Sequence, residues 1–141
     1  MEEALFFGWI DSQHKAIEGR RMQRFTPRKK NSLWTELNKE HVHRLERLGL
    51  VTDAGRRVLP PMGQRSFRID AGVETALKQA RCCSQFKRFA PLYQLIRAYN
   101  VAFYKKRNPD MYQQTLQHLI DETKKDRMFG EWNDYGRLTD Y

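Results

Sequence analysis

The chain has 141 residues and a formal net charge of +9, from 26 Lys and Arg against 17 Asp and Glu. Its length fits one domain, and a content of 40% hydrophobic and 12% aromatic residues can bury a core, which excludes a chain disordered throughout. The excess of positive charge favours an anionic partner and does not determine the fold.

The first elements in chain order are a short helix and a β-hairpin. The apolar N-terminus predicts a helical segment that stops at Gly8. A polar connection that contains Glu18 and Gly19 joins two segments that favour strand, as in a hairpin. Pro27 ends the second strand, because proline has no N–H to donate to the ladder. The two predicted strands cover residues 9–11 and 22–26.

A longer helix is predicted after the hairpin. Asn31 or Ser32 offers a side-chain oxygen as the cap of a helix that starts near Leu33, and Gly49 ends it. Residues at spacings of three and four predict one buried face. That face consists of Trp34, Leu37, His41, Leu45 and Leu48.

Further helices are predicted to the C-terminus. Thr52 and Asp70 can each cap a helix, and Pro91 suits the first position of another. The predicted helices cover residues 53–59, the segment after Asp70, and residues 84–89, 91–107 and 110–125. The last segment, residues 129–141, carries several aromatic residues, and we expect it to dock on the body.

The predicted fold class is therefore mainly α, as a single small domain over residues 1–141 with about six helices and one short N-terminal β-hairpin. Cys82 and Cys83 are neighbours and cannot form a relaxed disulfide, so they are interpreted as helix-buried thiols in a reducing compartment. The chain shows no signal peptide and no apolar segment of about 20 residues. We expect a cytoplasmic protein without membrane insertion, cofactor or metal.

Cations and aromatic residues gather in the hairpin and just after it. The cations are Arg24, Arg28, Lys29 and Lys30, and the aromatic residues are Trp9, Phe25 and Trp34. Guanidinium groups bind phosphate or carboxylate, and aromatic faces stack on bases. Ser32 opens a predicted helix whose free N–H groups can hold an anion. We therefore predict an anion-recognising cleft between hairpin and helix, with nucleic acid as the first candidate partner.

Two other interpretations of this region need no nucleic acid. In the first, the aromatic residues belong to the core and Arg24 pairs with Asp11. In the second, exposed Leu5, Phe6 and Phe7 mark a surface for a protein partner or a homodimer.

An enzyme of unknown reaction is a further alternative. It would use Asp11, Arg24 and Arg28, with His14 beside Asp11 as an acid–base pair if the hairpin brings them together. His41 lies on the predicted apolar face and is interpreted as a core histidine. The sequence has no recognisable nucleophile elbow, phosphate-binding glycine loop or carboxylate metal cluster, so a binding role is favoured and no catalytic residue is assigned.

A second basic cluster follows in the helical part of the chain. Tyrosines lie near it in the sequence, so the cluster could follow a phosphate backbone, and a solvated helix face is the alternative. Its members are Lys87, Arg88, Arg97, Lys105, Lys106 and Arg107.

Residues 2–59 resemble the YdeI/OmpD-associated family. The motif of that family, ALCFGWID…RFTPR…S-x-W-S-x-x-N, is matched by residues 4–11 and 24–28 and by Ser32, Trp34 and Asn38, while Phe6 replaces its Cys and Thr35 its second Ser. The resemblance implies a bacterial protein associated with bacteriocin protection or stress, an upstream segment missing here, and a subfamily-type C-terminus. The resemblance adds Asn38 to the candidate anion site. The site then comprises Trp9, Asp11, Arg24, Arg28, Lys29, Lys30, Ser32, Trp34 and Asn38.

Overall fold

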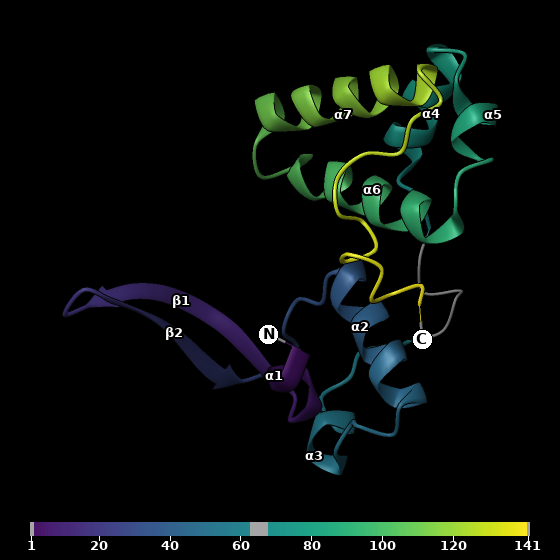
Figure 1. Ribbon diagram of the computed structural model, residues 1–141. Helices are drawn as coiled ribbons and strands as arrows, with labels where there is room; N and C mark the ends of the chain where they lie inside the picture. Colours follow the sequence, from purple (N-terminus) through teal and green to yellow (C-terminus); the bar gives the residue numbers. More distant parts are fainter. Residues whose placement is uncertain (1, 63–67, 141) are drawn as a thin grey trace. The chain divides into compact units, whose positions relative to one another are not determined.

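The computed structural model describes residues 2–62 and 68–140, without the side chains of Glu2, Asp11 and Ser12. It has two compact units, Met1–Gly63 and Gln64–Tyr141. The described residues form seven helices and one two-stranded antiparallel sheet (Figure 1). The predicted class, mainly α with an N-terminal hairpin, is confirmed. The predicted single domain over residues 1–141 stays a prediction.

The first unit consists of three helices and the hairpin. Its elements are α1 (Glu2–Phe6), β1 (Trp9–Ile17), β2 (Arg20–Pro27), α2 (Glu36–Arg47) and α3 (Asp53–Arg56). A small core closes it, formed by Leu5, Trp34, Val42, Leu45 and Val51. Gly8 makes the turn from α1 into β1 with φ +69°, and a Cβ there would lie 2.4 Å from Val58 Cγ2, so only glycine fits. The predicted stop at Gly8 is confirmed.

The hairpin is longer than the sequence predicted. β1 and β2 pair from Trp9 opposite Pro27 to Ile17 opposite Arg20, with an irregularity between Asp11 and Gln13. Glu18 and Gly19 form the turn with φ values of 50° and 74°, as a two-residue hairpin turn of this hand requires. None of the described side chains of the ribbon is buried, so these strands lack the alternating pattern by which sequence reveals a strand.

Helix α2 begins three residues later than predicted, at Glu36. The cap is Thr35, whose Oγ1 accepts from the N–H of Asn38 at 3.1 Å. The predicted cap residue Ser32 instead belongs to a tight turn, in which its Oγ accepts from the N–H of Lys29 at 3.0 Å. The predicted end is confirmed, because Gly49 adopts φ +69° just after the helix. Leu48, predicted on the buried face, is exposed.

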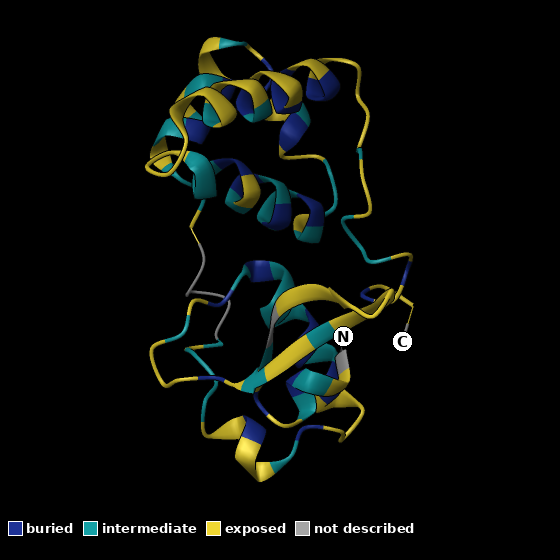
Figure 2. Cartoon of the chain, turned by 90° about the vertical axis from the view of Figure 1, so that its left-hand side faces the viewer, coloured by how far each residue is buried: buried dark blue, intermediate teal, exposed yellow. Residues whose placement is uncertain are grey.

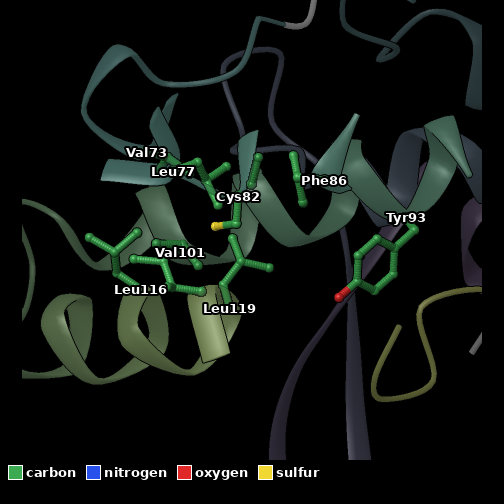
Figure 3. Packing of buried hydrophobic residues seen from close by; sticks show 10 residues of the cluster. Val73, Leu77, Cys82, Phe86, Tyr93, Val101, Leu116 and Leu119 are labelled. Atoms are coloured by element: carbon green, nitrogen blue, oxygen red, sulfur yellow. The ribbon is translucent and has the colours of Figure 1, made fainter. Parts of the chain in front are cut away.

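The second unit is helical. Its elements are α4 (Ala71–Gln79), α5 (Cys83–Phe86), α6 (Pro91–Tyr104) and α7 (Pro109–Lys124). Asp70 caps α4, as predicted, by accepting from the N–H groups of Gly72 and Val73. One core joins the four helices (Figure 3), and it includes Val73, Leu77, Cys82, Phe86, Tyr93, Val101, Leu116 and Leu119.

Both cysteines are free thiols in this unit. Cys82 is buried and Cys83 is half-buried. Burial raises the pKa of the Cys82 thiol, so Cys82 stays in the protonated, inert form. Burial is confirmed for Cys82, which lies just before α5 and not within a helix, whereas Cys83 begins α5 and is only half-buried.

The C-terminal segment docks on the second unit in part. Phe129 and Trp132 pack on the core, and each ring forms a T-shaped pair with the Tyr93 ring, at centroid distances of 6.1 and 5.8 Å. Tyr135 departs from the prediction, because 79% of it is exposed and its backbone has a φ of 55°. None of the helices in residues 2–62 and 68–140 is long and apolar enough to cross a membrane.

Candidate functional site

The β1–β2 ribbon extends away from α1, α2 and α3 (Figure 1), and residues along both strands are exposed (Figure 2). Residues that face each other across an antiparallel pair share a face of the ribbon. One face carries Lys15, Arg20 and Arg24, together with Gln13, Ile17 and Met22. The other face carries Arg21, His14 and Gln23 and, at the end near α1, Trp9 and Phe25. Cations are therefore present on both faces.

Arg28 lies inside the first unit and not on its surface. Only 5% of it is exposed, and its guanidinium group lies 3.8 Å above the centre of the Trp34 ring. Its Nη1 donates to the carbonyl oxygen of Leu33 at 2.9 Å, and its backbone N–H donates to the carbonyl oxygen of Gly8 at 2.8 Å. Trp34 is itself buried. These two predicted site residues meet, but they hold the loop after β2 against the core.

The loop between Arg28 and α2 displays the remaining predicted cations. Lys29 and Lys30 are exposed, and Ser32 fixes the turn below them. Asn38 lies in the first turn of α2 and is half-buried. The pair of lysines therefore extends the positive charge of the ribbon beyond Pro27.

The end of the ribbon near α1 forms an open, mainly apolar hollow of about 410 Å³. It is lined by Glu3, Ala4, Phe7, Trp9 and Phe25. The three aromatic residues are 56%, 41% and 38% exposed in chain order, which is unusual for side chains of this size.

The structure thus divides the predicted cleft into two places. Trp34 belongs to the core, as one alternative expected, whereas Trp9 and Phe25 line the open hollow. Glu3, Ala4 and Phe7 are lining residues that the predicted anion site omitted. Their position just before Gly8 could have indicated that they line the hollow, because a tight turn at Gly8 places β1 beside α1.

The apolar N-terminal surface is smaller than predicted. Leu5 is buried, Phe6 is half-buried against the core, and only Phe7 of the three is exposed. The prediction that all three are exposed is therefore wrong, because α1 turns its Leu5 side inward.

The second basic cluster is largely engaged within its own unit. Lys87 Nζ lies 3.6 Å from Glu74 Oε1, and Arg88 Nη2 lies 3.3 Å from Asp126 Oδ1. Arg97 donates to the carbonyl oxygen of Phe129 and lies over its ring at 4.5 Å. Burial lowers the pKa of the Arg97 guanidinium, because removal from water disfavours its charged form. The contacts with Phe129 offset this loss of hydration free energy.

The end of α6 engages two more members of that cluster. Lys105 Nζ lies 2.9 Å from Asp70 Oδ1, and this hydrogen bond raises the pKa of Lys105 and lowers that of Asp70. Arg107 covers the Phe103 ring at 4.0 Å. The helix ends at Tyr104, so these cations follow it and do not lie in its last turn as predicted. Lys106 is exposed.

The described residues offer few groups for catalysis. His41 is buried, as the core interpretation expected, and His14 lies on the exposed ribbon. The backbone of Asp11 pairs with that of Phe25, while its side chain lies outside the described part of the chain, and so do the predicted contacts of that side chain. Among the side chains that are described, no three of His, Cys, Asp or Glu are grouped in a way that could hold a metal ion.

Residues 1–58 match a family model described as a domain of unknown function, DUF8412. The match spans α1 to α3 and so includes the ribbon and the hollow. No curated protein and no solved structure matches the chain. Because the matched description gives no activity, the resemblance to the YdeI/OmpD-associated family stays a prediction.

Proposed function

We propose that this chain binds an anionic partner, with nucleic acid as the first candidate, through the β1–β2 ribbon and the adjoining Lys29 and Lys30. The observation that carries the proposal is a two-stranded hairpin exposed on both faces, with Lys15, Arg20, Arg21 and Arg24 along it.

The stability of an exposed hairpin of this length calls for an explanation. A two-stranded hairpin in water is at best marginally stable, because it buries little apolar surface. Here β1 has nine residues, which makes the ribbon roughly 30 Å long. A ribbon two strands wide can enter the major groove of a duplex or lie along a single strand, where its cations replace the counterions of several phosphates. A bound nucleic acid therefore supplies the contacts that the ribbon lacks.

The test is fluorescence anisotropy with short single- and double-stranded DNA and RNA over a salt series. We expect tight binding at low salt that weakens steeply as salt is added. In the variant K15A/R24A, the slope of log affinity against log salt should decrease by about 1.5, the value for two lost phosphate contacts. The matched control is K106A/K124A, which removes the same charge from exposed positions of the second unit.

Two outcomes would contradict the proposal. One is a lack of binding at low salt to any of the four nucleic acids. The other is an equal loss of slope in K15A/R24A and K106A/K124A, which would mean that only the total charge of the chain matters and that the ribbon is not the interface.

A protein partner or a homodimer is the alternative function, favoured by the exposed ring of Phe7. Light scattering over a concentration series tests it, because a dimer that uses this surface should dissociate in F7A. A bacterial stress or bacteriocin-protection role, implied by the family resemblance, would be carried out through either interface.

A further inference from the structure

The hollow at the α1 end of the ribbon is a second feature of the same surface, and its chemistry differs from that of the cationic strands. We infer that it takes an unpaired base, so that the preferred partner is a single-stranded nucleic acid. This inference rests on the proposed function and adds to it the form of nucleic acid that is bound.

Three aromatic residues are exposed around the one hollow. Phe7, Trp9 and Phe25 each keep more than a third of their surface in water. Single exposed apolar residues are ordinary, whereas three large rings at one site indicate a binding surface. Aromatic faces bind bases by stacking whatever their sequence, since every base has a π-face. In a duplex the bases are stacked on one another and cannot enter.

The charge at the hollow differs from the charge along the strands. Among the described side chains that line the hollow, Glu3 is the ionisable one. Its carboxylate repels a phosphate but can accept an N–H from the edge of a base. The phosphates therefore belong to the strand that leaves the hollow, where Arg21 lies farther along the face that carries Phe25. Arg24 precedes Phe25 in the sequence and lies on the opposite face. In this inference the base lies in the apolar hollow, and its phosphates lie beside the cations of the ribbon.

The size of the hollow also suits a single base. The volume of about 410 Å³ falls within the roughly 300–1,000 Å³ of pockets that bind small organic groups. An unstacked base fits such a space, while its sugar and phosphate stay outside because the hollow is open. A peptide strand would instead be expected at the free edge of a ribbon.

The experiment compares the full chain with the variant W9L/F25L, which keeps the hollow apolar but removes two stacking faces. We expect the affinity for a short single-stranded oligonucleotide to decrease at least about fivefold, the loss of one stacked base. The salt slope should not change, because no phosphate contact is lost. Binding of a duplex of the same length should also be unaffected. Far-UV circular dichroism and thermal melts establish that the variant is folded.

The matched control is I17A/M22A, which truncates two exposed apolar side chains on the opposite face of the ribbon. It should bind the single strand like the wild-type chain. A further variant, W9F/F25Y, keeps both aromatic faces and should retain the affinity if stacking is the cause.

The outcomes separate this inference from the proposed function. If the wild-type chain binds no nucleic acid at low salt, both fail. If it binds with a steep salt slope and W9L/F25L binds single strands equally well, only the base site is overturned. A loss of affinity that is equal for single strands and duplexes overturns it too. So does a dimer in the wild-type chain that becomes a monomer in W9L/F25L, since a second copy would then fill the hollow.

Discussion

The guanidinium group of Arg28 is stacked on an indole ring and bonded to a main-chain oxygen, while its neighbours in the sequence point to solvent. A buried hydrogen bond to a charged group contributes about 1.5–3 kcal/mol, and a desolvated cation–π contact can add to this. The residue therefore stabilises the first unit, and its removal leaves the Leu33 carbonyl without this donor.

We predict that R28A lowers the free energy of unfolding by about 2 kcal/mol. R28K should recover only part of the loss, because an ammonium group lacks the planar stack. Urea unfolding followed by tryptophan fluorescence measures the change, and K29A, at an exposed neighbour, is the control. An R28A protein as stable as the wild type would show that the stack over Trp34 contributes nothing.

Glu122 gives a prediction on pH. Hydrogen bonds from Arg127 and Lys125 lower the pKa of its carboxyl group to about 2, from an ordinary value of 4.5. Because the pKa in the folded state lies below that in the unfolded state, the stabilisation is complete above about pH 4.5 and is lost as the pH falls toward about 2.

The wild-type chain should therefore lose more stability between pH 6 and pH 3 than E122Q, which cannot ionise. Urea midpoints at the two pH values measure the difference, and E131Q, at an exposed glutamate, should behave like the wild type. An equal loss in the wild type and in E122Q would contradict the role of Glu122.

Sequence reasoning found several residues of the candidate site but could not assign their exposure. Arg24 and Arg28 lie in one short motif, yet the first is on the ribbon and the second is in the core. The difference arises from the end of β2 at Pro27 and the backbone bond from Arg28 to Gly8. A long-range bond of this kind leaves no periodic signal in the sequence, and neither does the approach of α1 that completes the hollow.

At the scale of elements, the hairpin turn allows a direct test of ribbon stability. Glu18 adopts a φ of 50°, which costs an ordinary L-residue about 1–2 kcal/mol and costs asparagine less. We predict that E18N stabilises the ribbon, so that the amides of β1 and β2 exchange several-fold more slowly with deuterium. G19V should do the reverse, because a β-branched residue is strained at φ 74°. Unchanged exchange in both variants would mean that the turn does not limit the opening of the ribbon.

Most helices were predictable because their caps are local. Asp70, Thr52 and Gly49 occupy the cap positions that the sequence assigned to them. The start of α2 was predicted wrongly because Asn31, Ser32 and Thr35 all offer a suitable oxygen, and the choice among them depends on the tight turn at Lys29. The length of the strands was underestimated for a related reason, since an exposed ribbon has no buried face to impose a pattern.

At the scale of the whole molecule, the described residues form two hydrophobic clusters, one within each unit. The core of the second unit consists of ten buried residues from its own segments, with Phe129 and Trp132 packed on them. We predict that a fragment of residues 64–141 folds alone and unfolds cooperatively in urea, as followed by circular dichroism at 222 nm. F129A in the fragment should lower its stability by about 3 kcal/mol, since Phe129 packs on the core and against Tyr93. A gradual, non-cooperative transition would show that this core is insufficient by itself.

The sheet described here has no interior strand, so β1 and β2 each turn one row of main-chain N–H and C=O groups outward. Such edges can pair with the same edge of another molecule and begin aggregation. The positive charges of two ribbons repel each other and so oppose this pairing. Salt screens the repulsion and limits its range to about 8 Å at physiological ionic strength. The colloidal stability of the chain should therefore be highest in dilute buffer, and concentrated salt should favour fibre-like assembly.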